Sequence, residues 1–234
     1  MNAPIFDTKV VTNFLTEDEV NLILSEYEES HKQFVDAPFY RDGVLQNHTQ
    51  GIICNDHAGN KIVMPNFKQT ANLVETRLKA NFPGEFSIGT MHILKSYQPY
   101  KCHTDGIVGQ ADVDDFHYGA YTFVIPLETV DSYTIVFNEY YENGKLLDEW
   151  LADNPDMQPK NVISDEIYNK HLDAEFKDYM NYLSIDTIFP WTKGACLGMS
   201  RYKFHGSDNF PKRIHSKLGI IVWTVCDYGP NSAR

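Results

Sequence analysis

The sequence predicts a mainly β, α+β protein in which two N-terminal helices pack on an antiparallel double-sheet barrel. Helical periodicity is confined to two early segments and one late one, whereas strand-like runs dominate from residue 86 onward. An apolar fraction of 42% in 234 residues suffices for one domain with a sizeable core. We expect a single domain over 1–234, with helical support in 1–85, a β core in 86–226 and a helical insertion at about 148–187.

Composition restricts the class of partner and the compartment. The net charge of −12 argues against broad affinity for nucleic acids or anionic membranes. Neither an apolar run long enough to span a membrane nor a secretory signal is indicated. Four scattered cysteines without a Cys-x-x-Cys pair suggest reduced thiols. We expect a cytoplasmic protein with no nucleic-acid or membrane partner.

Two helices are expected before residue 86. Thr16 and Glu19 form a capping box, Leu15 and Val20 form a hydrophobic staple, and apolar residues then recur at helical spacing to about Ser30. A second amphipathic helix is predicted over residues 66–81.

The segment between these helices, His31–Ile62, reads as irregular structure with one or two short strands. Two histidines in it, His48 and His57, are interpreted as surface or hydrogen-bonded side chains rather than metal ligands.

The β core is predicted from five strand-like runs, which are Phe86–Leu94, Tyr118–Leu127, Tyr133–Tyr141, Ala195–Lys203 and Lys217–Val225. Asn143-Gly144 indicates a type I′ hairpin turn leading to a strand at Leu146-Leu147. In the insertion, Ser164 caps a helix reaching Leu183, and His171 lies on its apolar stripe as a packing residue.

A His-x-Asp triplet provides the first candidate site. His103 and Asp105 follow a predicted strand, and in extended backbone residues i and i+2 face the same side. They supply two-thirds of a 2-His-1-carboxylate metal site, which leaves coordination positions open on Fe(II). The triplet alone favours a polar loop end with a solvated Asp over a metal site. Candidates for the third ligand are His117, His205 and His215.

A lone lysine opens the last apolar strand. Lys217 precedes a run of buried character, where a cation is costly unless it is paired with an anion or reaches solvent at the strand end. His205, at the end of the preceding strand-like run, lies twelve residues earlier. Both features place polar chemistry at the ends of late strands.

This ordered set of residues resembles the Fe(II)- and 2-oxoglutarate-dependent dioxygenases, especially their prolyl-4-hydroxylase-like branch. The set comprises Tyr-x-Pro-Tyr-x-x-His-x-Asp over 97–105, His205 after a strand opened by Lys193-Gly194, and Lys217. The resemblance spans residues 86–226 and implies a double-stranded β-helix (jelly roll) with N-terminal helices packed on one sheet and a helical insertion between late strands.

The resemblance implies that His103, Asp105 and His205 bind Fe(II). The implied reaction consumes O2 and 2-oxoglutarate, releases succinate and CO2, and hydroxylates a C–H bond of a small molecule, amino acid or peptidyl residue, with ascorbate as an optional reductant. Retention of Asp105, where halogenating relatives have a small residue, favours hydroxylation. Cys102 next to His103 is interpreted as an accident of sequence rather than a redox group.

The resemblance also implies that Lys217 pairs with the distal carboxylate of 2-oxoglutarate, where many members have Arg. Arg213 is a rival anchor. Gly219 stands where some members carry Ser, so a second hydrogen bond to the co-substrate is expected to be absent. Tyr97 or Tyr100 would add a hydroxyl donor, or would simply pack.

Two other classes of function remain open at this point. One is a cupin-like metal enzyme that does not use 2-oxoglutarate, and the other is a non-enzymatic β-sandwich binding module. The acidic loop Asp112–Asp115 and the helix over 164–183 would lie where a lid or a substrate-selecting wall could form.

Overall fold

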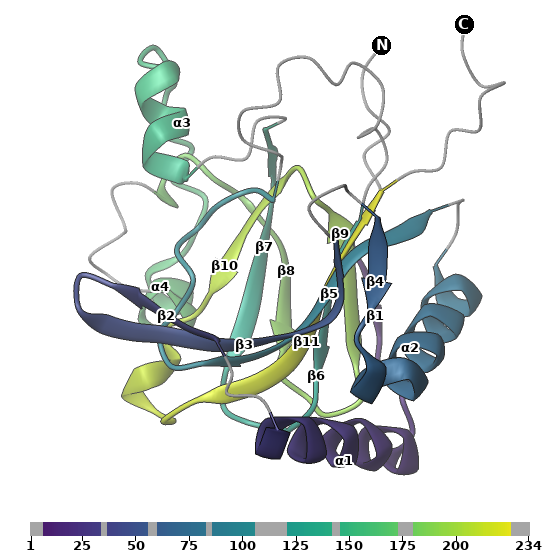
Figure 1. Cartoon of the computed structure of the whole chain (residues 1–234). Coiled ribbons are helices and arrows are strands. Elements are labelled where there is room, and N and C mark those ends of the chain that lie inside the picture. The colour runs from purple at the N-terminus through teal and green to yellow at the C-terminus, as the bar shows by residue number, and fades with distance from the viewer. Residues whose placement is uncertain are drawn as a thin grey trace, which may run out of the picture.

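Two antiparallel sheets form the centre of the molecule (Figure 1). The computed structural model describes residues 7–33, 37–55, 60–82, 86–105, 121–141, 146–172 and 180–225. The large sheet has the order β1-β9-β6-β11-β5-β3-β2, with β4 paired to β3, and the small sheet has the order β10-β7-β8. The strands of the large sheet are β1 Lys9–Val11, β2 Ala37–Arg41, β3 Val44–Asn55, β4 Lys61–Val63, β5 Ser87–Ser96, β6 Tyr121–Pro126, β9 Cys196–Ser200 and β11 Lys217–Val225. Those of the small sheet are β7 Tyr133–Tyr140, β8 Ile185–Pro190 and β10 Lys203–Ser207.

Helices cover the outer faces of both sheets (Figure 1). α1 (Glu17–Gln33) and α2 (Lys68–Asn81), with the 3-10 turn η1 (Pro65–Phe67), share a hydrophobic core with β5, β6 and β11. α3 (Leu147–Asp153) and α4 (Asp165–His171) share another with β7 and β10. A third apolar cluster, contributed by β6, β7, β8 and β9, lies between the sheets. The predicted jelly-roll class, mainly β with helices on one sheet and a helical insertion between late strands, is confirmed.

Strand β11 shows how the fold divides apolar from functional residues. Leu218, Ile220 and Val222 point to the helices and join their core. The alternate residues of β11 point between the sheets and line a cavity; they are Lys217, Gly219, Ile221 and Trp223. The period-2 alternation therefore places a charged side chain inside the barrel without breaking the helix-facing core.

The N-terminal expectations for helices are confirmed. α1 begins directly after Thr16, whose backbone N–H donates to Glu19 Oε2 at 2.8 Å while its hydroxyl accepts from Glu19 N at 3.3 Å. This is the predicted capping box. α2 follows η1 and ends at Asn81, within two residues of the predicted bounds at each end.

The segment His31–Ile62 was expected to be irregular with one or two short strands, but its described parts are mainly β and contain β2, the long strand β3 and the start of β4. Asp42 (φ 52°) and Gly43 (φ 75°) join β2 to β3 in left-handed backbone conformations. An Asp-Gly pair is a strong type I′ hairpin signal, so this hairpin was readable from sequence. Residues 1–85 therefore extend the large sheet as well as supplying helices.

Three further details of the β core differ from prediction. The predicted strand Ala195–Lys203 is interrupted by a turn at Arg201-Tyr202, so Lys203 and His205 belong to β10 of the small sheet and not to β9 of the large one. Leu147 begins α3 rather than a strand, because Trp150 packs on Phe204 with ring centroids 5.1 Å apart. Strand β8 was not predicted.

Several predicted features lie outside the described residues. They are His57, His117, the acidic loop Asp112–Asp115, the Asn143-Gly144 turn and residues 173–179 of the helix expected to reach Leu183. Among the described helices, none has the length and apolar character needed to cross a bilayer.

Candidate metal centre

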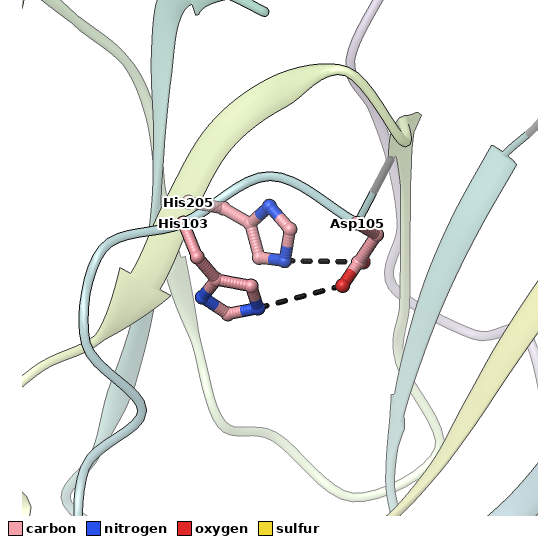
Figure 2. A group of neighbouring side chains, drawn as sticks. All are labelled: His103, Asp105 and His205. Atoms are coloured by element: carbon pink, nitrogen blue, oxygen red, sulfur yellow. Dashed lines mark ion pairs between the residues drawn. The ribbon is translucent and has the colours of Figure 1, made fainter. Parts of the chain in front are cut away.

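His103, Asp105 and His205 converge at one point between the sheets (Figure 2). The segment after β5 runs antiparallel to β10, and His103 and His205 are directly opposed. Each donates its backbone N–H to the carbonyl of the other, both at 2.9 Å. Asp105 N donates to Arg201 O at 2.8 Å, two residues away from the register that the histidine pair sets. The opposed histidine pair and this separate backbone hydrogen bond together bring the three side chains to one point.

The donor atoms have the spacing of a metal site. His103 Nε2 lies 3.4 Å from Asp105 Oδ1, and His205 Nε2 lies 3.3 Å from Asp105 Oδ2. All three ligand atoms lie within 4.8 Å of one another. Metal–ligand bonds of about 2.1 Å place neighbouring ligands about 3.0 Å apart, so a small contraction would satisfy a transition metal. Two imidazoles and one carboxylate on one face fit non-haem Fe(II).

Backbone carbonyls orient both imidazoles. His103 Nδ1 lies 2.6 Å from Lys101 O, and His205 Nδ1 lies 3.0 Å from Lys203 O. A carbonyl can only accept, so both rings carry a proton on Nδ1 and direct Nε2 to the centre. The structure thus selects the tautomer that binds a metal.

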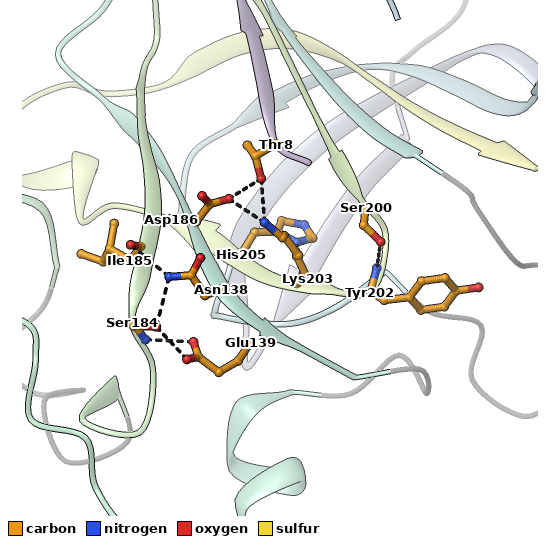
Figure 3. Close-up of polar contacts among 10 residues, drawn as sticks. All are labelled: Thr8, Asn138, Glu139, Ser184, Ile185, Asp186, Ser200, Tyr202, Lys203 and His205. Atoms are coloured by element: carbon orange, nitrogen blue, oxygen red, sulfur yellow. Dashed lines mark hydrogen bonds and ion pairs between the residues drawn. The ribbon is translucent and has the colours of Figure 1, made fainter. Parts of the chain in front are cut away.

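The Lys203 side chain is itself held by a partly buried ion pair (Figure 3). Its Nζ lies 2.7 Å from Asp186 Oδ2 and 3.1 Å from Thr8 Oγ1. Asp186 belongs to β8 and Thr8 directly precedes β1. The residue whose carbonyl orients His205 is therefore tied to both sheets.

Asp105 is an anion in this environment. Burial raises its pKa, but His205 and His103 outweigh burial and hold the pKa well below its usual value. Thr122 Oγ1 donates to Asp105 Oδ2 at 2.6 Å and fixes the carboxylate plane. Arg201 Nη2 donates to the Asp105 carbonyl at 2.8 Å. Neither Thr122 nor Arg201 was identified from the sequence.

A cavity of about 130 Å³ adjoins the three ligands. Its walls include the apolar side chains of Leu94, Val124, Ile221 and Trp223, and Lys217 also lines it. Apolar walls around the three candidate ligands and a buried cation give a low effective dielectric, in which electrostatic contacts are stronger than in water.

Lys217 has hydroxyl partners in place of a carboxylate. The side chain is 2% exposed, and Nζ donates to Ser132 Oγ and Ser207 Oγ, both at 3.1 Å. Its third N–H has no partner in the described part of the chain. Burial lowers the pKa of Lys217 to about 7, although Asp208 acts in the opposite direction. A buried lysine so placed has the capacity to bind an anion.

Trp191 explains why residue 219 is glycine. The Trp191 ring centroid is 4.2 Å from Lys217 Nζ, a cation–π contact. A Cβ on Gly219 would lie only 2.7 Å from Cζ2 of the same ring. The indole thus occupies the space of a side chain at 219 and forms that wall of the cavity.

The two tyrosines of the motif occupy different environments. Tyr100 lines the cavity, and its hydroxyl accepts a hydrogen bond from Asn47 Nδ2 at 2.8 Å. Burial raises the pKa of Tyr100, so the phenol retains a proton that it can donate. Tyr97 instead packs between His48 and His215, with centroid distances of 5.4 and 5.5 Å. Tyr97 is absent from the cavity wall.

The rival residues also lie apart from the cavity wall. Arg213 pairs with Asp208 and Asp131, with Arg213 Nε 3.1 Å from Asp131 Oδ2. His215 is exposed beside Tyr97. His171 is buried against Tyr133 at a centroid distance of 4.4 Å, as a packing residue.

A second cavity of about 460 Å³ lies between the small sheet and the insertion. Ile135, Phe137, Leu147 and Cys102 line it, whereas His103, Asp105 and His205 do not. Burial raises the pKa of the Cys102 thiol, so this thiol is protonated and unreactive. The two cavities share Tyr100, Gly206 and Ser207 in their walls, so they adjoin each other.

Comparisons with known proteins show a shared fold. No protein-family model and no curated protein sequence matches the chain. Similar solved structures include the α-ketoglutarate-dependent epimerase SnoN of nogalamycin biosynthesis, with a TM-score of 0.60, 11% identity and coverage of 94% of this chain and 78% of SnoN. An oxidoreductase of the 2OG-Fe(II) oxygenase family from Burkholderia pseudomallei matches with a TM-score of 0.54, 11% identity and coverage of 93% and 83%. HygX from Streptomyces hygroscopicus, solved with nickel and 2-oxoglutarate, matches with a TM-score of 0.53 and 15% identity. The match covers 94% of this chain and 83% of HygX. The chain therefore has the fold of these oxygenases.

The packing of Trp191 on Gly219 yields a stability prediction. Gly219→Ser should lower the free energy of unfolding by about 1–3 kcal/mol, the usual cost of overpacking, as measured by chemical denaturation. In a double-mutant cycle, Trp191→Phe should relieve part of this cost, because the smaller ring vacates the contact. Additive effects of the two substitutions would contradict the proposed steric origin.

Proposed function

We propose that the chain is an Fe(II)- and 2-oxoglutarate-dependent oxygenase that hydroxylates a C–H bond of a small molecule. One observation carries the proposal. The cavity beside the His103–Asp105–His205 cluster also contains Lys217, a buried cation without a carboxylate partner in the described residues. A keto acid with a second carboxylate has the groups to bind both ends of this cavity.

The residues of the chain bind and orient the reactants. His103, Asp105 and His205 would hold iron through Nε2, carboxylate and Nε2 atoms, with the opposite face directed to the cavity. Lys217 would pair with the distal carboxylate of 2-oxoglutarate, and Tyr100 would donate its hydroxyl proton to the same ligand. Tyr97 has no such role in this proposal, because it packs outside the cavity.

Iron and the keto acid, once bound, supply the oxidising power by coupling O2 reduction and decarboxylation to succinate with oxidation of the substrate. The protein contributes geometry and exclusion of water, through the apolar walls formed by Val124, Ile221 and Trp223. A metal enzyme that uses no keto acid would leave the buried Lys217 without a purpose, and a binding module would not require three convergent ligands.

The proposed class of substrate rests on structural neighbours. SnoN has been solved with Fe3+, α-ketoglutarate and nogalamycin RO, and HygX with nickel, 2-oxoglutarate and hygromycin B. Both ligands are small molecules, so we favour a small molecule over a peptide. The neighbours also include a carbocyclase and an epimerase. The Asp105 carboxylate, where halogenating relatives have a small residue, favours hydroxylation over halogenation.

The ligand set predicts a specific loss of metal binding. His103→Ala or His205→Ala should weaken Fe(II) or Co(II) binding by more than about 100-fold, because each removes a direct ligand. Metal titration under nitrogen measures the affinity, and succinate formation from 2-oxoglutarate without added substrate should also cease. His215→Ala is the matched control and should retain both properties. If His215→Ala lost metal binding while His205→Ala retained it, the third ligand would be His215 and not His205.

The anchor predicts a change in co-substrate requirement. Lys217→Ala should raise the 2-oxoglutarate concentration for half-maximal succinate formation by about 10- to 100-fold at pH 6.5, because a charge-assisted contact is lost. Lys68→Ala, on the exposed face of α2, is the inert control. Arg213→Ala should have a smaller effect than Lys217→Ala. The reverse order would assign the anchor to Arg213.

The lowered pKa of Lys217 predicts a pH dependence with a definite sign. Below pH 7 the lysine is already charged and 2-oxoglutarate affinity should be nearly constant. Above pH 7 binding must be accompanied by proton uptake, so the dissociation constant should rise by up to about tenfold per pH unit between pH 7 and 8.5. Calorimetry under nitrogen measures this dissociation constant. An affinity independent of pH between pH 7 and 8.5 would contradict the role of Lys217 as the anchor.

A further inference from the structure

Asp208 is a buried carboxylate for which the proposed reaction has no direct use. It is 0% exposed. Its Oδ1 accepts a hydrogen bond from Ser132 Oγ at 2.8 Å, and its Oδ2 pairs with Arg213 Nη2. Burying a carboxylate is costly even when it is hydrogen-bonded.

The hydrogen bonds give a directed chain from Lys217 to Asp208. An ammonium group can only donate, so Ser132 Oγ must accept from Lys217 Nζ at 3.1 Å. A hydroxyl has one proton, and Ser132 therefore donates that proton to Asp208. Ser132 is 1% exposed, so bulk water does not compete for these bonds.

The indirect contact leaves the lysine available to a ligand. A direct Lys217–Asp208 ion pair would place a carboxylate where the co-substrate must bind. With one hydroxyl between them, Asp208 still favours the charged lysine through space, while two N–H groups are used by Ser132 and Ser207 and the third is free of described partners.

The charged groups around Lys217 come from several elements. Asp208, after β10, favours the cation, and Arg213, after η3 (Phe210–Lys212), opposes it. Asp131 pairs with Arg213 at the surface, and His171 of α4 is influenced by the same three charges. Neutral groups among the described residues also contact Lys217, namely the Trp191 and Phe210 rings at 4.2 and 4.8 Å, the Ser207 hydroxyl and the paired strand residue Ser96.

We propose that Ser132 and Asp208 are positioning residues that hold Lys217 in place and set the pH range in which the cavity accepts a dicarboxylate keto acid. Arg213 acts in the opposite electrostatic sense. The inference rests on the proposed function, because its ligand is 2-oxoglutarate. None of the three residues needs to touch that ligand, and their effect is transmitted through the charge state of Lys217.

Two substitutions with opposite electrostatic signs test this inference. Asp208→Asn removes the charge that favours the ammonium and should lower the pKa of Lys217. Arg213→Gln removes the opposing charge and should raise it. For a downward shift of one unit from about 7, the 2-oxoglutarate dissociation constant should rise about tenfold at pH 8 but less than twofold at pH 6. Arg213→Gln should instead improve binding at pH 8.

The measurement has two independent readouts. Calorimetry of 2-oxoglutarate binding to the Mn(II)-loaded protein, in two buffers of different ionisation enthalpy, counts the protons taken up at each pH. NMR titration of the Lys217 side chain in the metal-free protein reports its pKa without any co-substrate. Ser132→Ala should shift both readouts in the same direction as Asp208→Asn. If Asp208→Asn fails to fold, Ser132→Ala replaces it in the test.

The outcomes separate this inference from the proposed function. Opposite shifts in Asp208→Asn, or Ser132→Ala in its place, and Arg213→Gln support the inference. An unchanged Lys217 pKa in all folded variants, or equal weakening of binding at every pH, overturns it. A purely structural role would not shift the Lys217 pKa in opposite directions in the two variants. Absence of 2-oxoglutarate binding in the unsubstituted protein refutes the proposed function instead, while the NMR titration still reports on the electrostatic coupling.

Discussion

The reciprocal backbone hydrogen bonds between His103 and His205 are the constraint on which the metal centre depends. They join two segments that lie on either side of β6, β7, β8 and β9 in the sequence. Because side chains alternate along extended backbone, a register shift of one residue would turn one histidine away from the other. Asp105 is held separately, by the hydrogen bond from its N–H to Arg201 O. The carbonyls of Lys101 and Lys203 orient the two imidazoles.

The second constraint is electrostatic and lies deeper between the sheets. Lys217, Asp208 and Ser132 place polar groups in a region that apolar packing would fill at lower cost. Such a cluster is retained where it serves recognition, because an isolated buried cation has few ways to recover its lost hydration. Trp191 and Gly219 also pack closely in this region. The Trp191 ring, directly after β8, covers the backbone of Gly219 in β11 and contacts the Lys217 ammonium.

Local signals in the sequence predicted local structure well. The Thr16–Glu19 capping box located the start of α1, and the bounds of β11 were predicted to the residue. The approach of His103 to His205 was expected only through a resemblance to a family. Thr122, Asn47 and Ser132 were missed because each contacts a residue at least 17 positions away, which no local pattern records. The turn at Arg201-Tyr202 was missed because it contains neither glycine nor proline.

The contact of Thr8 with Lys203 has a consequence for the order in which the molecule is assembled. These residues are 195 positions apart, and β1 pairs with β9 across a similar separation. Contacts so distant along the chain carry a large loop-closure cost and slow the search for the native topology. During synthesis, the first strand must wait for almost the whole chain to emerge before it finds its neighbour. We therefore expect the support behind His205 to be completed late, so a nascent or truncated chain would lack a properly braced ligand.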